Sequence, residues 1–336
     1  MPFPPTRLGD DKQFIDVVNE LLVVSGSSFD EIAGIGITNQ RETTVVWDKA
    51  TGKAVYNAII WQSKQTQGLC EERMDKTDFI QSRTGLRMNP YFSASKIRYI
   101  LDHIENGQQR AERGELLCGT IDTWIIYKMT NGATYATDVS NASRTMLFNI
   151  FEMRFDPELC AIWDIPLSML PEVKDNSADY GEASFFRTDV HIGGVAGDQQ
   201  SALFGQCCFQ EGESKNTYGT GCFMLMNIGE TPILSKQGLL TTVAWRLNGK
   251  TTYALEGSVF IGGAIVQWLK EEMRWFEDSV DSEYYAAKRK DTAGVYFVPA
   301  FTGLGAPYWD PNARGCFFGL TRGSGKAALA RAVLEA

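Results

Sequence analysis

The stretch GIGITNQRETTVVW, Gly34–Trp47, places two apolar, strand-like runs on either side of a polar tip, NQRE at 39–42. A tight hairpin would carry Asn-Gly or Asp-Gly at such a tip. A guanidinium and a carboxylate are instead costly to hold against apolar surface. A surface ion pair is one reading of Arg41 and Glu42, and it would contribute little. The apolar flanks favour the other reading, in which the pair offers donors and acceptors together to a polyhydroxyl ligand.

Helix-like and strand-like segments alternate outward from this stretch. Helices are expected over 11–24, 93–104 (capped by Ser93), 121–130 (capped by Thr120), 156–163 (capped by Asp156), 198–205, 257–273 and 326–336. Strands are expected over 32–38, 43–47, 54–60, 115–119, 190–197, 214–227 (two strands), 241–257 (a hairpin about Asn248-Gly249) and 294–299. Some strands fall in hairpins and others in crossovers, which predicts an α/β fold of two domains with mixed sheets flanked by helices. The pattern of the sequence changes near 206–212, so we expect domains at 1–206 and 207–336.

Composition excludes several classes of protein. The 336 residues are 44% hydrophobic and 22% charged, with a net charge of −9. An acidic balance does not favour nucleic acid or an anionic membrane as a partner. The apolar runs are too short to span a membrane, and the first residues show no export or transit pattern, so a cytoplasmic protein is expected.

Cysteine and histidine offer little chemistry. The seven cysteines are scattered without a C-x-x-C pair, which indicates small core residues in a reducing compartment. The two histidines, His103 and His191, lack neighbours suited to catalysis or metal binding, and we expect both to be structural or solvated.

Asp198 stands where an α/β protein places its ligand crevice, at the end of the strand VHIGGVAG and the start of a helix. It could equally cap that helix, because Asp is a preferred N-cap. The nearby Gly193, Gly194 and Gly197 favour a functional role, since glycine lets backbone approach a ligand closely.

The Gly219-Thr220-Gly221 turn has two readings. Its backbone N–H groups could cradle a phosphate, with hydroxyls from Thr217 and Thr220 beside them. It could also be a β-turn that needs positive φ. Two other glycine motifs fail: RGSGKA (322–327) lacks the remaining Walker A positions, and Gly34-x-Gly36 lacks the third glycine of a dinucleotide fingerprint.

Aromatic residues also have two readings. Trp61 ends the segment AVYNAIIW, and Tyr91 lies in NPYFSASK. Aromatic residues in such segments most often belong to a core or an interface. An aromatic face is also a frequent partner for the C–H side of a small polyol.

Taken in order, several stretches resemble the FGGY carbohydrate kinase family, within the actin-like, ribonuclease-H-like ATPases, and in particular its glycerol-phosphorylating members. They are GITNQRETTVVWDKATGKAVYNAIIWQ, NPYFSASKIRYILDH, GTIDTWIIYKMTNG, DVSNASRTMLFNI, GDQQSALFGQ, NTYGTGCFMLMN, GLLTTVAW, YALEGSVFIGGAIVQWL and VPAFTGLGAPYWDPNARG. The resemblance runs from about residue 30 to the last residue.

The resemblance implies a role for each matching residue. Arg41, Glu42, Tyr91 and Gln199 match hydroxyl contacts to glycerol, and Trp61 and Phe223 match the rings that wall its carbon chain. Asp198 matches the general base and, with the nucleotide phosphates, a ligand for Mg²⁺. Thr220, Gly263 and Gln267 match ATP contacts. The implied reaction converts glycerol and ATP to glycerol 3-phosphate and ADP, in a protein that forms dimers or tetramers.

The two ends depart from the family pattern. Members open with a hairpin that carries an Asp-Gln-Gly-Thr-Thr phosphate loop, which MPFPPTRLGDD (1–11) does not match. The chain also stops inside the helix-like stretch 326–336, before a Gly-Gly segment that holds the nucleoside in the family. We therefore expect an enzyme truncated at both ends, with a whole polyol half, an incomplete nucleotide half and little or no catalysis by itself. Two alternatives stay open: a kinase of another polyol or sugar from the same family, and a non-catalytic glycerol-binding pseudoenzyme.

Overall fold

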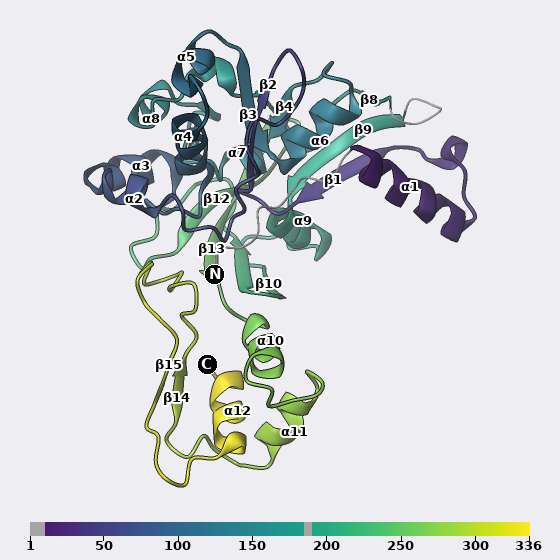
Figure 1. The fold of residues 1–336 in the computed structure, drawn as a ribbon. Coiled ribbons are helices and arrows are strands. Elements are labelled where there is room, and N and C mark those ends of the chain that lie inside the picture. Colours follow the sequence, from purple (N-terminus) through teal and green to yellow (C-terminus); the bar gives the residue numbers. More distant parts are fainter. Residues whose placement is uncertain (1–10, 185–189) are drawn as a thin grey trace. The chain divides into compact units, whose positions relative to one another are not determined.

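The computed structural model of the protein describes residues 11–184 and 190–336, and 1–10, at the start of the stretch that departs from the family pattern, lies outside them. The chain divides into two compact units (Figure 1). Unit 1 comprises Met1–Glu213, Asn227–Leu234 and Thr241–Leu255, and unit 2 comprises Ser214–Met226, Ser235–Leu240 and Glu256–Ala336.

Unit 1 holds the elements up to α9. In chain order these are α1 (Asp11–Ser25), η1 (Phe29–Glu31), β1 (Ile35–Asn39), β2 (Thr44–Asp48), α2 (Gln67–Glu71), η2 (Met74–Lys76), α3 (Thr77–Thr84), α4 (Ser93–His103), α5 (Gly107–Glu112), β3 (Leu116–Thr120), α6 (Ile121–Met129), β4 (Ala136–Asp138), α7 (Val139–Ala142), β5 (Phe148–Asn149), β6 (Arg154–Phe155), α8 (Pro157–Ile162), η3 (Leu167–Met169), β7 (Glu172–Lys174), β8 (Glu182–Ala183), β9 (Val190–Gly197) and α9 (Asp198–Gly205).

The later elements belong mainly to unit 2. They are β10 (Ser214–Tyr218), β11 (Cys222–Asn227), β12 (Leu240–Leu247), β13 (Lys250–Val259), α10 (Ala264–Glu271), α11 (Asp281–Ala287), β14 (Tyr296–Val298), β15 (Cys316–Phe318) and α12 (Lys326–Leu334). Most of β12 lies in unit 1, and β13 passes from unit 1 into unit 2 after Leu255.

The sheet β1-β9-β8 organises unit 1. β1 pairs in parallel with β9, and β8 pairs antiparallel with the other edge of β9, so the sheet is mixed as expected. Helices α6 and α9 lie against β1 and β9 (Figure 1). Ile37 packs with Ile126 of α6, while the next residue, Thr38, exchanges a hydrogen bond with Ser201 of α9. Because side chains alternate along a strand, the two helices cover opposite faces.

Unit 2 has its own core. Buried apolar side chains of α10, β14 and α12 form it, including Leu269, Phe297 and Val333. β10 pairs antiparallel with β11, and β14 with β15.

Local sequence rules hold where one residue decides the conformation. Asp156 caps α8 by accepting from the Glu158 N–H, with Pro157 at the first helical position, as expected. Asn248 and Gly249 have φ of 51° and 77°, the paired positive values of the expected hairpin turn between β12 and β13.

Two expected elements are wrong. Over 54–60, Ala54 and Ile59 form isolated bridges to β2 instead of a strand. The helix expected over 257–273 begins only at Ala264, because β13 continues to Val259 and a close turn follows. A Cβ on Gly263 in that turn would lie 2.8 Å from the Gly219 carbonyl oxygen.

The amphipathic face expected of α1 is only partly buried. Leu22 is buried and Val18 is half-buried, whereas Val17 and Leu21 are more than 60% exposed. Among the described residues of this helix, the side chains that pack against the protein therefore form a narrow stripe with i, i+4 spacing.

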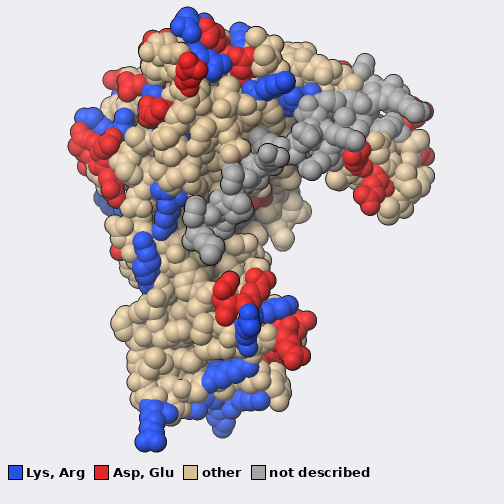
Figure 2. Space-filling view, in the orientation of Figure 1, with Lys and Arg blue, Asp and Glu red and all other residues tan. Residues whose placement is uncertain are grey.

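The surface agrees with the composition. Basic and acidic side chains are scattered in small groups over the face that Figure 2 shows. The described residues include all seven cysteines, and four of them are buried. None of the helices within 11–184 and 190–336 is long and apolar enough to cross a membrane.

Candidate functional site

The charged tip joins two strands that do not pair with each other. β1 belongs to the sheet with β9, whereas β2 pairs with β3. Arg41 and Glu42 are 2% and 1% exposed, and Glu42 has a φ of 64°. A bulky residue in this left-handed region is uncommon, and such strain gathers at functional sites. The surface ion-pair reading is therefore wrong.

Arg41 brings several predicted residues together. Its Nε lies 3.5 Å from Asp198 Oδ1, and its Nη2 donates to the Tyr91 hydroxyl at 3.3 Å. Nη1 donates to Gln200 Oε1 at 3.3 Å. The aliphatic stem lies against Gly197, where a Cβ would meet Arg41 Cγ at 2.7 Å. A side chain at position 197 would thus displace the guanidinium.

Glu42 is held by cations that sequence reasoning missed. Arg144 is fully buried, and its Nε donates to Glu42 Oε1 at 2.7 Å. Its guanidinium also lies 5.6 Å and 5.2 Å from the ring centroids of Tyr91 and Phe92. The sequence does offer a signal, because a cation within an apolar stretch such as NASRTMLF requires a buried partner.

Lys96 is the other missed cation. Its Nζ donates to the carbonyl oxygens of Glu42 at 2.9 Å and Tyr91 at 2.6 Å. Ser93 also donates to the Glu42 carbonyl, so its hydroxyl serves the tip and does not cap α4, where the N-cap is Phe92. Complete burial lowers the pKa of Lys96 to about 7, although the charge of Glu42 opposes this shift.

Asp198 is the first residue of α9 and not its cap. The N-cap is Gly197, without a side-chain capping bond, so the capping alternative is wrong. The Asp198 side chain is 40% exposed, and its Oδ2 accepts from Gln199 Nε2 at 2.9 Å. The carboxylate thus combines a fixed orientation with access to solvent, which suits a group that accepts a proton.

An aromatic wall stands beside these charges. The rings of Trp61 and Tyr91 meet edge to face with centroids 5.8 Å apart. Tyr91 is buried and Trp61 is half-buried. Tyr91 is therefore a core residue, as one interpretation of the sequence had it, but it is not only that. Its hydroxyl also accepts a hydrogen bond from Arg41.

The remaining predicted residues belong to unit 2. Thr220, Gly263 and Gln267 are exposed, and Phe223 is 8% exposed on β11. The Gly263 N–H donates to the Gly219 carbonyl, so the loop before α10 is bound to the 219–221 loop.

The positive-φ reading of this loop is wrong. Gly219 and Gly221 are absent from the positive-φ glycines of the described chain. Glycine is required at position 221 because there is no room for a side chain. A Cβ there would lie 2.5 Å from the Val259 carbonyl oxygen.

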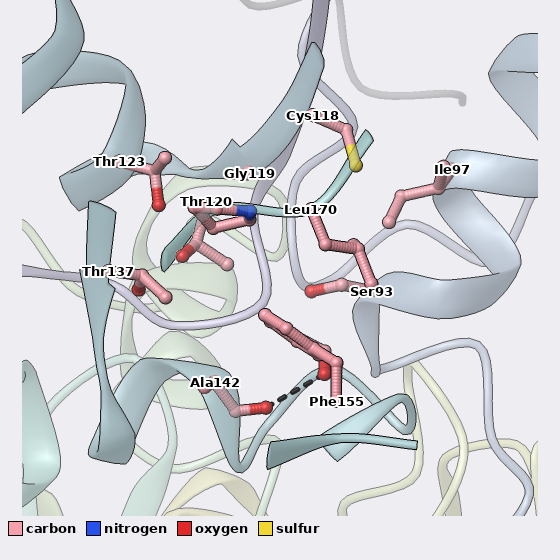
Figure 3. Close-up of a pocket in the computed structure, with 12 residues that line it drawn as sticks. Ser93, Ile97, Cys118, Gly119, Thr120, Thr123, Thr137, Ala142, Phe155 and Leu170 are labelled. Atoms are coloured by element: carbon pink, nitrogen blue, oxygen red, sulfur yellow. Dashed lines mark hydrogen bonds between the residues drawn. The ribbon is translucent and has the colours of Figure 1, made fainter. Parts of the chain in front are cut away.

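Two cavities in unit 1 lie outside the predicted residue set. The pocket drawn in Figure 3 has a volume of about 20 Å³, so it has room for one water and is too small for a polyol. A groove of about 620 Å³ is lined by β1, β9, α9 and β12, including Gln200, which contacts Arg41. Within the described chain, His, Cys, Asp and Glu side chains nowhere gather in groups of three or more that could hold a metal.

The histidines lie elsewhere, as expected. His191 is 44% exposed beside Glu182, and His103 stacks on Tyr99.

Comparison with known proteins assigns the fold. The family model described as the FGGY family of carbohydrate kinases, N-terminal domain, matches residues 12–205, and that of the C-terminal domain matches residues 214–336. A gluconate kinase from Lactobacillus acidophilus, 22% identical, has a TM-score of 0.81 and covers 99% of this chain and 69% of its own. That likeness supports the fold alone, and the actin-like, ribonuclease-H-like α/β class is confirmed.

Relatives with higher sequence identity to this chain are named glycerol kinase. The glycerol kinases of Bacillus velezensis and Bacillus subtilis are each 58% identical to this chain over 324 residues, covering 95% of it. The chain spans 65% of the length of these curated relatives. Plasmodium falciparum glycerol kinase with ADP is 39% identical, with a TM-score of 0.84 over 96% of this chain and 65% of its own. The chain belongs to the FGGY family of carbohydrate kinases.

Proposed function

We propose that this chain carries the polyol site of a glycerol kinase, an enzyme that transfers the γ-phosphoryl group of ATP to glycerol. A terminal hydroxyl oxygen of glycerol forms the new P–O bond, the bond to ADP breaks, and Asp198 takes the hydroxyl proton. The observation that carries the proposal is the buried Arg41–Glu42 pair, bound to both Tyr91 and Asp198. The names of the relatives above support the same substrate.

The charges suit a small polyol. Glu42 accepts hydrogen bonds from hydroxyl groups and Arg41 donates them, while Gln199 can do either. Directional contacts of this kind orient one hydroxyl for in-line attack, which is the main task in phosphoryl transfer. Trp61, and Phe223 in unit 2, are proposed as apolar walls for the carbon chain.

The nucleotide contacts are proposed in unit 2. Thr220 offers a hydroxyl to phosphate oxygens. Gly263 and Gln267 lie at the start and on the exposed side of α10, where further ATP contacts are proposed.

Magnesium is proposed to arrive with the nucleotide. Mg²⁺ is commonly bound through one or two carboxylates together with substrate phosphates. The half-exposed Asp198 carboxylate fits that donor set, because it offers Mg²⁺ an oxygen ligand. When bound, the ion would neutralise charge on the transferring phosphoryl group.

Three further expectations, which concern the whole protein and not the site, remain part of the proposal. They are a domain division at 206/207, a cytoplasmic location and a homo-oligomer. The family matches ending at 205 and beginning at 214 support the first.

The test uses the purified chain with glycerol, ATP and Mg²⁺. Formation of ADP and glycerol 3-phosphate would support phosphoryl transfer and would contradict the expectation, drawn from the sequence, of little or no catalysis by the chain itself. Where turnover occurs, Asp198→Asn should lower it by about 10²–10⁴-fold with retained glycerol binding. A panel with gluconate and longer polyols tests substrate choice. Glycerol heat without ATP heat in calorimetry would identify a binding protein, and absence of glycerol heat would contradict the proposal.

A further inference from the structure

A buried polar network lies behind the strand ends that carry the proposed site. Its centre is Asp138, which is fully buried and caps α7. Oδ2 accepts from the Ser140 N–H at 2.6 Å, from the Ser140 hydroxyl and from Asn176 Nδ2 at 2.7 Å. Oδ1 accepts from Asn141 Nδ2 at 2.7 Å and from its N–H at 3.3 Å. Far more donors converge here than a helix cap needs.

One branch of the network reaches the end of β9. The Ser140 hydroxyl donates to Asp138 and accepts from the Gly197 N–H at 2.9 Å. A hydroxyl has one proton, so the bond to Asp138 turns its lone pairs toward Gly197. Gly197 immediately precedes Asp198 and contacts the stem of Arg41.

The other branch reaches the end of β1. Asn141 and Asn39 exchange two side-chain hydrogen bonds, of 3.1 Å and 3.0 Å. Asn39 is the last residue of β1 and lies in register with Gly197 of β9. The two branches therefore hold both strand ends, from which Arg41 and Asp198 project.

A second buried carboxylate completes the network. Asp122 accepts from Asn39 Nδ2 at 3.3 Å and from Thr137 Oγ1 at 2.6 Å. Thr137 also lines the small pocket of Figure 3. Burial, and then the charge of Asp122, raise the pKa of Asp138 to about 7, while the hydrogen bonds to Asp138 oppose the rise.

We propose that Asp138 is a positioning residue, which acts through Ser140 and Asn141 to fix the spacing of Arg41 and Asp198 in the polyol site. This inference rests on the proposed function for the identity of the ligand. Asp138 does not touch the ligand. A shift of the strand ends by a fraction of an ångström would misplace a directional hydrogen bond, because its strength falls steeply with angle.

The chain offers a matched control in Asp156. It is also a buried N-cap, 2% exposed, and it accepts from Arg83 and Asn149. Asp138→Asn and Asp156→Asn therefore each replace a buried capping carboxyl group by an amide of the same size. Ser140→Ala is a milder variant, since it removes only the hydroxyl that binds Gly197.

The experiment measures glycerol affinity by calorimetry and the exchange rate of the Gly197 amide by NMR, under conditions where each variant is folded. For Ser140→Ala and Asp138→Asn, we expect about tenfold weaker glycerol binding and at least tenfold faster exchange at Gly197. For Asp156→Asn, we expect a lower melting temperature with neither change.

The outcomes separate the two proposals. Unchanged affinity and exchange in Ser140→Ala would overturn the positioning role, even if Asp138→Asn fails to fold. If the unsubstituted chain binds no glycerol, the proposed function fails. The exchange rate at Gly197 then decides by itself whether Asp138 positions the strand end.

Discussion

Most of the polar groups proposed to bind ligand in unit 1 are buried, whereas those proposed in unit 2 are exposed. In unit 1, Arg41, Glu42 and Tyr91 are at most 4% exposed and are bound to one another or to further buried ions. In unit 2, Thr220, Gly263 and Gln267 are exposed, and the local structure depends on close contact between glycine loops.

The two ligands proposed above give a physical reason for this difference. A small polyol has only weak dipoles, so its orientation requires fixed charges in a low-dielectric setting. A nucleotide brings its own charge, and backbone N–H groups or a hydroxyl can contact its phosphates. Unit 1 must therefore hold strained, buried charge, whereas unit 2 need not.

The largest expected effect tests the buried charge. Glu42→Gln removes the carboxylate between Arg41 and Arg144. Because two guanidiniums would remain buried without it, we expect the free energy of unfolding to fall by about 3–5 kcal/mol. Urea denaturation measures it.

Glu158→Gln is the control. Glu158 pairs with Arg83 at 2.5 Å but is 67% exposed, so its loss should cost less than about 1 kcal/mol. Equal losses for the two variants would contradict the contrast between buried and exposed charge.

The next effect tests the close contact behind Arg41. Gly197 has φ −60° and ψ 148°, which alanine adopts freely, but its Cβ would meet Arg41 Cγ and Cδ at 2.7 and 2.8 Å. Gly197→Ala should therefore weaken glycerol binding about tenfold or more, because the guanidinium moves. At Gly205 a Cβ meets nothing within 4 Å, so Gly205→Ala should bind glycerol normally. Equal glycerol affinities for the two variants, measured by calorimetry, would contradict the steric argument.

A smaller effect concerns pH. The folded-state pKa of Lys96 is lowered from 10.5 to about 7, so between these values the unfolded chain binds more protons. Stability should then rise with pH across this window, by up to about 1.4 kcal/mol per pH unit from this group. Urea denaturation at pH 7.5, 8.5 and 9.5 should show a smaller slope for Lys96→Met. Parallel slopes would show that Lys96 stays charged in the folded protein.

The smallest effect on stability is expected in unit 2. Gln267 is exposed and contacts Glu271 one turn along α10. Gln267→Ala should change the free energy of unfolding by less than about 0.5 kcal/mol, yet weaken ATP binding. Thermal unfolding and ATP calorimetry measure the two quantities. A large loss of stability would show that this surface is structural.

Much of the fold could be predicted from local patterns. Asp156-Pro157 and Asn248-Gly249 specify their conformations through one or two residues, and both predictions are confirmed. The helix expected over 257–273 was wrong because its first turns are opposed by a distant loop at 219–221. No local pattern carries that information.

The candidate site divides in the same way. Arg41, Glu42 and Asp198 could be found from the sequence, because charge beside apolar strands or at a strand end is unusual. Lys96 was missed because a cation on a helix is ordinarily solvated. Arg144 was missed although its apolar stretch indicates a buried partner, because that stretch does not identify the partner. Asp138 was not identified from the sequence, because its link through Ser140 to Gly197 depends on contacts that only the structure shows.

The amino-acid order by itself determined the α/β class, the family resemblance and the charged tip, because these depend on periodicity and on residues adjacent in the chain. The tertiary structure alone decided which cations neutralise Glu42, why position 197 must be glycine and how both strand ends are held. Those properties depend on contacts within about 3 Å between residues more than fifty positions apart in the sequence, as where Arg144 meets Glu42 at 2.7 Å.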